Sequence, residues 1–201
     1  MDVAGSNAIL YDAFDSSGGR LVPCPVITPS CGGDCEEEEV QVELAIARGA
    51  GGVVLRPGKD CWSIEEWFGG KLLACLEERG LPALCPQKTV PPADVARVAK
   101  AHPRLPIIMI EANYRTHRPV CALLAAFPNV HLSIGANYAV HGAIEDLVER
   151  FGPQRLLFGT GIPTAEPMMG VTHLLYAGVS ESHKRMIGWE NLHRLIEGIR
   201  K

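Results

Sequence analysis

The amino-acid sequence predicts an α/β protein built around parallel strands, because short apolar runs alternate with helical patterns along the chain. The runs begin near residues 21, 52, 82, 106, 130 and 155, at steps of about 24 to 31 residues. A step of this length holds one strand and one helix, and its repetition is typical of a parallel sheet. The alternation alone leaves two closures open, a doubly wound sheet and a (β/α) barrel.

The strands are expected where apolar residues follow one another without interruption, as they do in strands buried on both faces. Four such strands are expected at residues 53–55, 82–85, 107–110 and 156–158, and a further strand is expected at residues 130–134. A first strand over residues 21–27 is weakened by Pro23 and Pro25, which have no backbone N–H to donate.

Helices are expected between the strands and after the last of them. They are placed at residues 35–48, 63–79, 91–102, 116–127 and 143–151, with a helical tail at 167–177, 180–187 and from 191. Ser63 and Glu66 have the spacing of a capping box, and Thr116 can cap the helix that follows it. Residues 1–20 are polar and indicate a short helix followed by a loop.

The composition is that of an ordinary globular chain. Its 201 residues are 47% hydrophobic and 21% charged, which suits one substantial core, and we expect residues 1–201 to form a single domain. A net charge of −4 gives no reason to expect nucleic acid or an anionic membrane as partner. No apolar run approaches the length of a membrane span, and the N-terminus lacks a signal pattern.

The chain has seven cysteines, an odd number, at positions 24, 31, 35, 61, 75, 85 and 121. Several lie inside apolar runs, where a free cysteine behaves as a small hydrophobic residue. Cys31 and Cys35 have a spacing that suits zinc, but no second Cys/His pair follows them. We therefore expect a cytoplasmic protein without disulfides.

Residues 143–163, AIEDLVERFGPQRLLFGTGIP, carry a family resemblance. They resemble the last barrel strand of the amidohydrolase-related, metal-dependent hydrolases, whose pattern reads roughly ERFGPERLLFGSDYP. Weaker likeness extends over most of the chain, from Leu21 to Leu195. The resemblance implies a TIM-type barrel, with the run at 155 as strand eight and the run at 21 as strand three. Strands one and two have no counterpart, so we expect an incomplete or distorted barrel of about six parallel strands with a helical tail.

The resemblance also implies a metal centre, usually zinc, at the carboxyl ends of the strands. Its ligands in the family are an HxH pair from strand one, a histidine each from strands five and six, and an aspartate from strand eight. The chain has no HxH pair. The two single histidines fall at Cys85 or Pro86 and at Glu111, and the aspartate falls at Gly161. Because no expected ligand is retained, we expect no metal cofactor.

Three residues at the expected strand ends are the candidate site residues: Arg56, Cys85 and Glu111. Cys85 can act as a nucleophile with Glu111 or His141 as its base, or it can be a core cysteine that fills space. Arg56 can bind a carboxylate or phosphate, or it can pair with Glu111. The sequence leaves these alternatives open.

The function expected from these observations is that of a catalytically degenerate family member that binds a small molecule or a partner at the barrel mouth. The alternative is an active hydrolase or decarboxylase, with zinc or another divalent metal bound around Cys85 and Glu111. A third hypothesis is an open-sheet scaffold. Because six strands leave two open edges, we expect a homodimer through the strand near residue 21 or the first 20 residues, where residues 8–11 can add a short strand.

Overall fold

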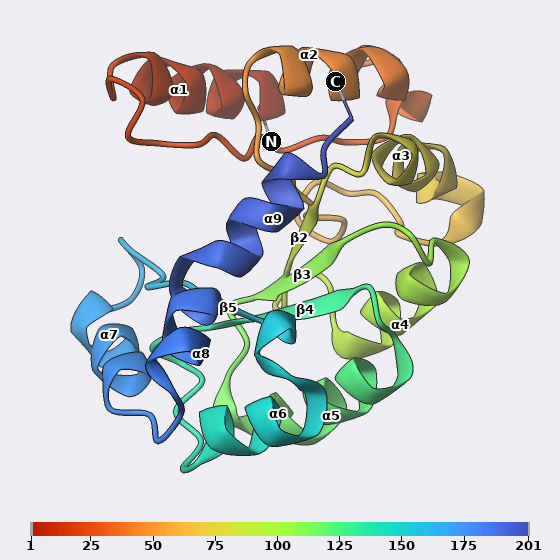
Figure 1. Ribbon diagram of the computed structural model, residues 1–201. Helices are drawn as coiled ribbons and strands as arrows, with labels where there is room; N and C mark the ends of the chain where they lie inside the picture. Colours follow the sequence, from red (N-terminus) through yellow and green to blue (C-terminus); the bar gives the residue numbers. More distant parts are fainter. Residues whose placement is uncertain (1, 201) are drawn as a thin grey trace.

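The computed structural model describes residues 2–200, and its centre is a sheet of five parallel strands (Figure 1). The strands are β1 (Val53–Val54), β2 (Ala83–Pro86), β3 (Ile107–Ile110), β4 (Val130–Ile134) and β5 (Leu156–Phe158). They lie in the order β1-β2-β3-β4-β5, so each strand pairs with the next one in the sequence. A doubly wound sheet reverses its strand order at a switch point, whereas a barrel does not. The sheet is therefore an open part of a barrel, and the five predicted strands are confirmed.

The expected strand at residues 21–27 is reduced to a single parallel bridge between Val26 and Val54. The carbonyl oxygens of Pro23 and Pro25 still accept hydrogen bonds from Gly51 N and Val54 N, at 3.1 and 2.9 Å. The two prolines cannot donate in return, so the ladder forms through their carbonyl groups alone. The segment therefore runs beside β1 as an irregular edge and is not a sixth strand of the sheet.

The helices lie where the sequence places them, within a few residues. They are α1 (Val3–Asp15), α2 (Glu38–Ala47), α3 (Glu66–Arg79), α4 (Pro92–Ala101), α5 (His117–Ala126), α6 (Ala143–Phe151), α7 (Pro167–Leu175), α8 (Glu181–Arg185) and α9 (Asn191–Glu197), with a π-helical turn at Met186–Glu190. Helices α3 to α6 follow one another in an arc along the sheet (Figure 1).

Three local expectations differ from the structure. Residues 8–11 belong to helix α1 and add no strand. Helix α3 begins at Glu66 itself, so no capping box forms, and Ser63 Oγ instead accepts a hydrogen bond from Glu65 N at 3.3 Å. Thr116 makes no capping bond, and its hydroxyl lies within donating distance of two acceptors, Asn113 O at 2.7 Å and Gln87 Oε1 at 2.8 Å.

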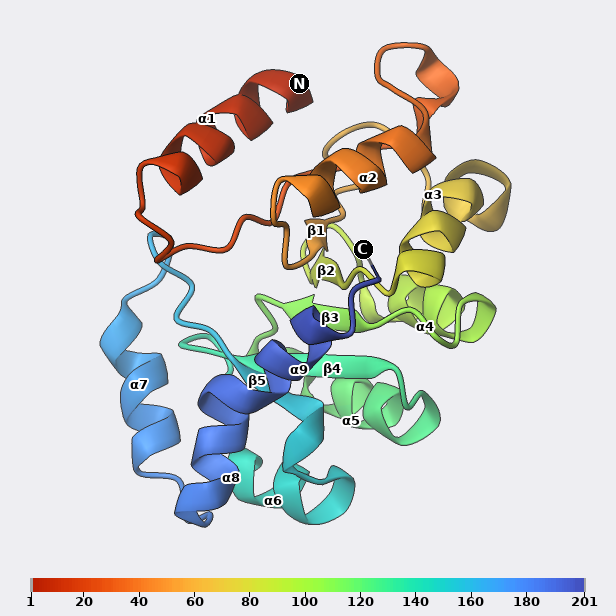
Figure 2. The same cartoon turned by 45° about the horizontal axis from the view of Figure 1, so that its top comes forward.

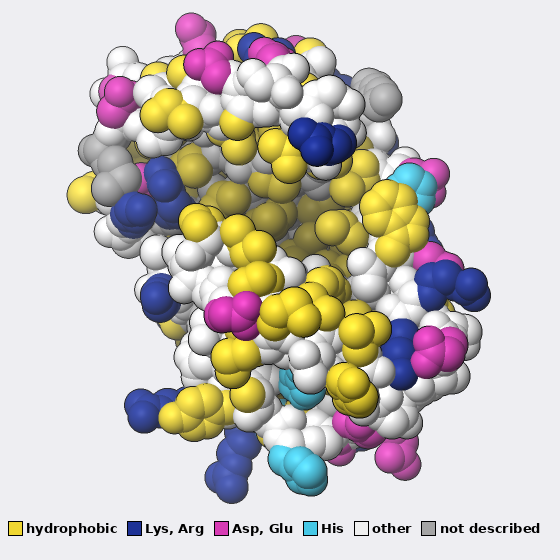
Figure 3. Space-filling model, turned by 90° about the vertical axis from the view of Figure 1, so that its left-hand side faces the viewer, with side chains coloured by type: hydrophobic (Ala, Val, Ile, Leu, Met, Phe, Trp, Pro, Cys, Tyr) yellow, Lys and Arg dark blue, Asp and Glu magenta, His cyan; other side chains and the backbone are white. Residues whose placement is uncertain are grey.

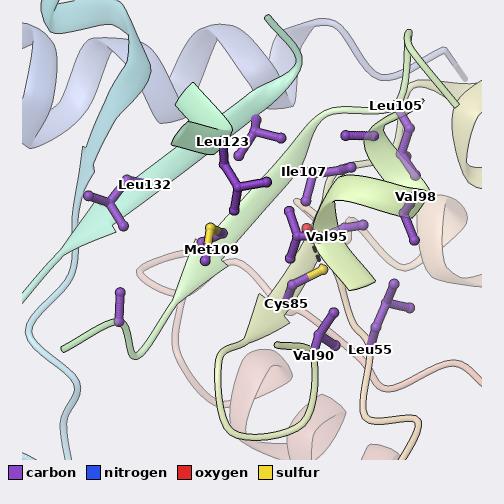
Figure 4. Packing of buried hydrophobic residues seen from close by; sticks show 14 of the residues in the cluster. Leu55, Cys85, Val90, Val95, Val98, Leu105, Ile107, Met109, Leu123 and Leu132 are labelled. Carbon is purple, nitrogen blue, oxygen red and sulfur yellow. Dashed lines mark hydrogen bonds between the residues drawn. The ribbon is translucent and has the colours of Figure 1, made fainter. Parts of the chain in front are cut away.

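The main core lies between the strands and helices α4 and α5. Figure 4 shows Ile107 and Met109 of β3 among Val95 and Val98 of α4 and Leu123 of α5. These side chains are at most 5% exposed. Burial of an aliphatic side chain contributes about 1.5–3 kcal/mol, so this layer holds the strands in register and positions the loops at their carboxyl ends.

The other end of the sheet is crossed by α9. Asn191 donates to Pro153 O and Leu156 O, both at 2.8 Å, and Arg200 N donates to Arg79 O at 2.8 Å. Each acceptor lies at the amino end of a strand or just before it, so α9 and the residues after it close this end (Figure 2). No described helix is both long and apolar enough to cross a membrane.

The side of the molecule between α1 and α7 is hollowed. Figure 3 looks onto this side and shows a largely hydrophobic floor below the segment that carries α1. Helix α1 itself has no buried residue, and Ile9 on it is 73% exposed. In a complete eight-stranded barrel, two further strands with their helices would close the ring between the first and last strands.

Candidate functional site

The site predicted at the carboxyl ends of the strands is a cavity of about 460 Å³ over β3, β4 and β5. Parallel strands bring all their carboxyl ends to one edge, so the loops after these three strands meet there. Its lining residues are Lys88, Ile110, Glu111, Ala112, Ser133, Gly135, Ala136, Asn137, Gly159, Thr160, Gly161, Ile162, Thr164 and Ala165. We call this cavity the mouth. Its size falls in the range of about 300–1,000 Å³ typical of small-molecule sites.

Three glycines give the mouth its shape. A Cβ on Gly135 would lie 2.5 Å from Gly159 O, so the loops after β4 and β5 approach closely only because neither adds a side chain there. Gly161 has φ 75°, in the left-handed region that favours glycine. Gly161 is also the position at which the resemblance places a metal-binding aspartate. The backbone at position 161 is therefore in a conformation that suits glycine better than aspartate.

The polar groups of the mouth are one cation, one carboxylate, three hydroxyls and one amide. Lys88 and Glu111 carry the charges, and Ser133, Thr160 and Thr164 carry the hydroxyls. The hydroxyls can donate and accept hydrogen bonds, and Lys88 can only donate. Such a set can bind a small anion that also has polar substituents.

Glu111 is the predicted site residue that lines the mouth. It follows β3 directly, is exposed, and has φ 58°. A non-glycine residue in this conformation costs of order 1–3 kcal/mol and is found most often at functional sites. No ion pair within residues 2–200 includes its carboxylate, so the charge faces the cavity without a fixed partner.

Arg56 pairs with a carboxylate other than Glu111, which was one of the two alternatives for its side chain. Its Nε and Nη2 donate to the two carboxylate oxygens of Asp60 at 2.9 and 3.2 Å. Both side chains are shielded, with 16% and 2% of their surface exposed. The pairing of Arg56 with Glu111 was therefore wrong. The guanidinium is held by a carboxylate four residues further along its own loop.

Cys85 lies in the core and does not line the mouth. Figure 4 shows it on β2 among Leu55, Val90 and Val95, with its thiol donating to Ala83 O at 3.8 Å. It is 1% exposed, and burial raises the pKa of its thiol to about 12. A thiol in this state is a poor nucleophile at neutral pH. The structure does not bring Arg56, Cys85 and Glu111 together at one site.

The mouth does not fit the zinc centre that the resemblance implies. Such a centre needs at least three nitrogen, sulfur or carboxylate ligands. Among the lining residues only Glu111 supplies one, and the lining includes no histidine, cysteine or aspartate.

A different cluster of metal-binding residue types lies outside the mouth, between α5 and α6. One ligand atom each from His117, Cys121 and Asp146 lies within 4.8 Å of the others. The signal for this cluster was the spacing of a histidine and a cysteine four residues apart on one helix, which places them on the same face.

The second acidic cluster already has a cation. Glu37, Glu38 and Glu39 surround the ammonium group of Lys71, at 2.5, 3.1 and 3.2 Å. These groups lie at the start of α2, where carboxylates are favoured by the helix dipole. The arrangement is a structural ion-pair network.

Comparisons with known proteins agree with the geometry. A family model described as amidohydrolase matches residues 3–196. Among curated proteins, no match is found. An uncharacterised TIM-barrel protein from Bordetella bronchiseptica is 19% identical, with a TM-score of 0.77 over 96% of this chain and 72% of that one.

Two decarboxylases are also similar in structure, each 14% identical to this chain. A 2,6-dihydroxybenzoate decarboxylase from Rhizobium has a TM-score of 0.73 over 97% of this chain and 76% of that one. A dihydroxybenzoic acid decarboxylase from Polaromonas, solved with manganese and the inhibitor 2-nitroresorcinol, has a TM-score of 0.52 over 97% and 74%. At these identities the likeness establishes the fold, and about a quarter of each neighbour has no counterpart here.

Proposed function

Because this chain belongs to the amidohydrolase family, we propose that it binds a small carboxylate-bearing molecule in the mouth without a metal ion there. The observation that carries the proposal is the donor set of the mouth. It holds one lysine, one glutamate and three hydroxyls, and it lacks the histidines and aspartate of a zinc centre. Binding of polar groups is therefore better supported than metal-assisted hydrolysis.

A hydroxylated aromatic acid matches this set of groups. Its carboxylate would pair with the Lys88 ammonium group, and a phenolic hydroxyl would donate to the Glu111 carboxylate. Ile110 and Ile162 supply apolar surface in the same cavity. Two neighbours of the same fold act on dihydroxybenzoates, according to their names. That likeness supports the choice of ligand class.

The proposal is tested by calorimetric titration with 2,6-dihydroxybenzoate and with resorcinol, which has the same ring and hydroxyls but no carboxylate. We expect the carboxylate to bind more tightly than resorcinol, and Lys88→Ala to weaken its binding about tenfold, because a hydrogen bond to a charged group contributes about 1.5 kcal/mol. Lys100→Ala is the matched control, since Lys100 is an exposed lysine on α4 and does not line the mouth. Equal binding by both variants would contradict the proposal.

Conversion of 2,6-dihydroxybenzoate to resorcinol separates this proposal from an active metal-dependent decarboxylase. We expect no resorcinol to form with or without added Mn²⁺ or Zn²⁺. Metal-dependent release of resorcinol that persists in Cys121→Ser would overturn the metal-free mouth. The Cys121→Ser substitution is chosen because it removes one ligand of the cluster between α5 and α6, whereas Cys121 does not line the mouth.

We also propose a cytoplasmic location and a homodimer. The seven cysteines are all free, as is usual in a reducing compartment. Helix α1 has no buried residue, and Ile9, Leu21 and Val22 are more than half exposed, which leaves apolar surface available to a second copy. Sedimentation of the chain and of a truncation starting at Gly19 tests the dimer. The truncation should be monomeric where the full chain is not.

A further inference from the structure

The cluster between α5 and α6 has the geometry of a three-ligand metal site. His117 Nε2 and Cys121 Sγ lie 3.7 Å apart. Zinc–nitrogen and zinc–sulfur bonds of roughly 2.0 and 2.3 Å at a tetrahedral angle separate the two ligand atoms by about 3.5 Å. The Asp146 carboxylate comes from the facing helix α6 and is within 4.8 Å of both. A shift of about 1 Å of this side chain completes a site with three protein ligands.

The histidine ring is held in an orientation that suits this role. His117 Nδ1 and the Tyr138 hydroxyl form a hydrogen bond of 2.8 Å, and Tyr138 is fully buried. With Nδ1 engaged in this way, Nε2 is the nitrogen that faces Cys121 Sγ. Metal-binding histidines usually have their second ring nitrogen fixed by such a partner, which orients the ring toward the metal.

A cation already occupies the neighbourhood of the three groups. Arg150 Nη1 lies 2.9 Å from Asp146 Oδ2 and 3.6 Å from Cys121 Sγ. The Arg150 side chain is 46% exposed, so it can rotate into solvent. The cluster therefore attracts positive charge, and its resident cation can be displaced without a backbone change.

We propose that His117, Cys121 and Asp146 bind a zinc ion that links α5 to α6. A thiolate, an imidazole and a carboxylate together favour zinc over the hard cations magnesium and calcium, which prefer oxygen ligands alone. The site is separate from the mouth, because none of its three ligands lines that cavity. It therefore does not depend on the proposed function. Tyr138 follows Asn137, which does line the mouth, so a bound ion would steady one wall of it.

The experiment uses the full chain stripped with a chelator and then titrated with Co²⁺ and Zn²⁺. Cobalt should bind with one equivalent and give the near-ultraviolet absorption of a cobalt–thiolate bond. Zinc should displace it with a Kd of about 1 μM or tighter, measured by competition with a chromophoric chelator. Cys121→Ser should abolish the thiolate absorption, and Asp146→Asn should weaken zinc binding at least tenfold.

Two further variants keep the test informative. Tyr138→Phe removes only the hydroxyl that holds His117 and should weaken zinc binding about tenfold. Cys35→Ser removes a thiol elsewhere, beside Thr28, and should bind cobalt with unchanged absorption. Thermal unfolding in chelator checks that every variant is folded. Absence of thiolate absorption in the wild-type chain, or its persistence in Cys121→Ser, would overturn the proposal.

Discussion

The side-chain amide of Asn7 forms two hydrogen bonds with the backbone of Val26, in the place of those that a neighbouring strand would form. Asn7 Nδ2 donates to Val26 O at 2.8 Å, and Val26 N donates to Asn7 Oδ1 at 3.0 Å. Asn191 acts in a related way at the opposite edge, where its amide donates to Leu156 O of β5. An open strand edge promotes pairing with other chains, and capped backbone groups reduce that tendency. The chain thus protects both edges of its open barrel with asparagine side chains.

The first prediction concerns this edge. Asn7→Ala should lower the free energy of unfolding by about 2 kcal/mol, because it removes two hydrogen bonds at about 1 kcal/mol each. Urea denaturation measures the loss. Ser6→Ala is the control, since the Ser6 hydroxyl donates only to Asp2 O within the same helix, and it should cost less than 0.5 kcal/mol, as is usual for surface changes. Equal costs for the two variants would show that α1 does not protect the edge.

The second prediction replaces the expected coupling of Arg56 with Glu111. Asp60→Ala should cost about 3 kcal/mol, because it leaves the Arg56 guanidinium shielded and unpaired. The double variant with Arg56→Ala should cost less than the sum of the single variants, as expected of directly paired groups. Chemical denaturation of all four proteins gives the coupling. Coupling of Arg56 to Glu111 instead of Asp60 would contradict the ion pair.

The third prediction follows from the backbone of Glu111. Glu111→Gly should stabilise the protein by about 0.5–1 kcal/mol, because glycine adopts φ 58° without the strain of a Cβ. Glu149→Gly is the matched control at an exposed position of helix α6, where glycine should cost about 1 kcal/mol. Thermal unfolding compares the two. A loss of stability in Glu111→Gly would show that this carboxylate has a partner in solution.

Strands such as β3 were predictable because an unbroken run of apolar residues is typical of a strand in a parallel sheet, and three of the four residues of β3 are buried. The same rule failed at residues 21–27, where Pro23 and Pro25 decide the hydrogen bonding. Neither alternative for Arg56 included its observed partner Asp60, although Asp60 lies four residues away. The contact of Asn7 with Val26 depends on how helix α1 packs against residues 23–26, and no local sequence pattern predicts that packing.

Site prediction from the sequence was limited for a related reason. The sequence places Glu111 at the carboxyl end of a strand, and in the structure Glu111 lines the cavity at that end of the sheet. Whether a residue at a strand end points into the mouth or into the helical layer depends on register, and Cys85 points into the core. The cluster of His117, Cys121 and Asp146 forms only where α5 and α6 face each other. The sequence spacing reveals the His117–Cys121 pair on α5, but it does not reveal that Asp146 of α6 lies beside them.

The last prediction concerns His131 on β4 and the dependence of stability on pH. Burial, reinforced by the positive charge of Arg155 and Arg194, lowers the pKa of His131 to about 4. Its Nδ1 has no hydrogen-bond partner among the described residues. An unfolded chain has the ordinary histidine pKa of about 6.5. Between these two values the unfolded state binds a proton that the folded state does not, so stability rises with pH across this window.

The contribution of His131 should be fully present above about pH 6.5 and should be lost as the pH falls toward 4, by up to about 3 kcal/mol. His131→Leu cannot titrate, so the difference in unfolding free energy between wild type and variant should change by this amount between pH 7 and pH 4. Carboxylates titrate in both proteins and cancel in the difference. Between pH 7 and pH 8 the difference should stay constant, because histidine is then neutral in both states. Urea denaturation at each pH gives the values, and parallel curves from pH 7 to pH 4 would mean that His131 reaches solvent in the folded protein.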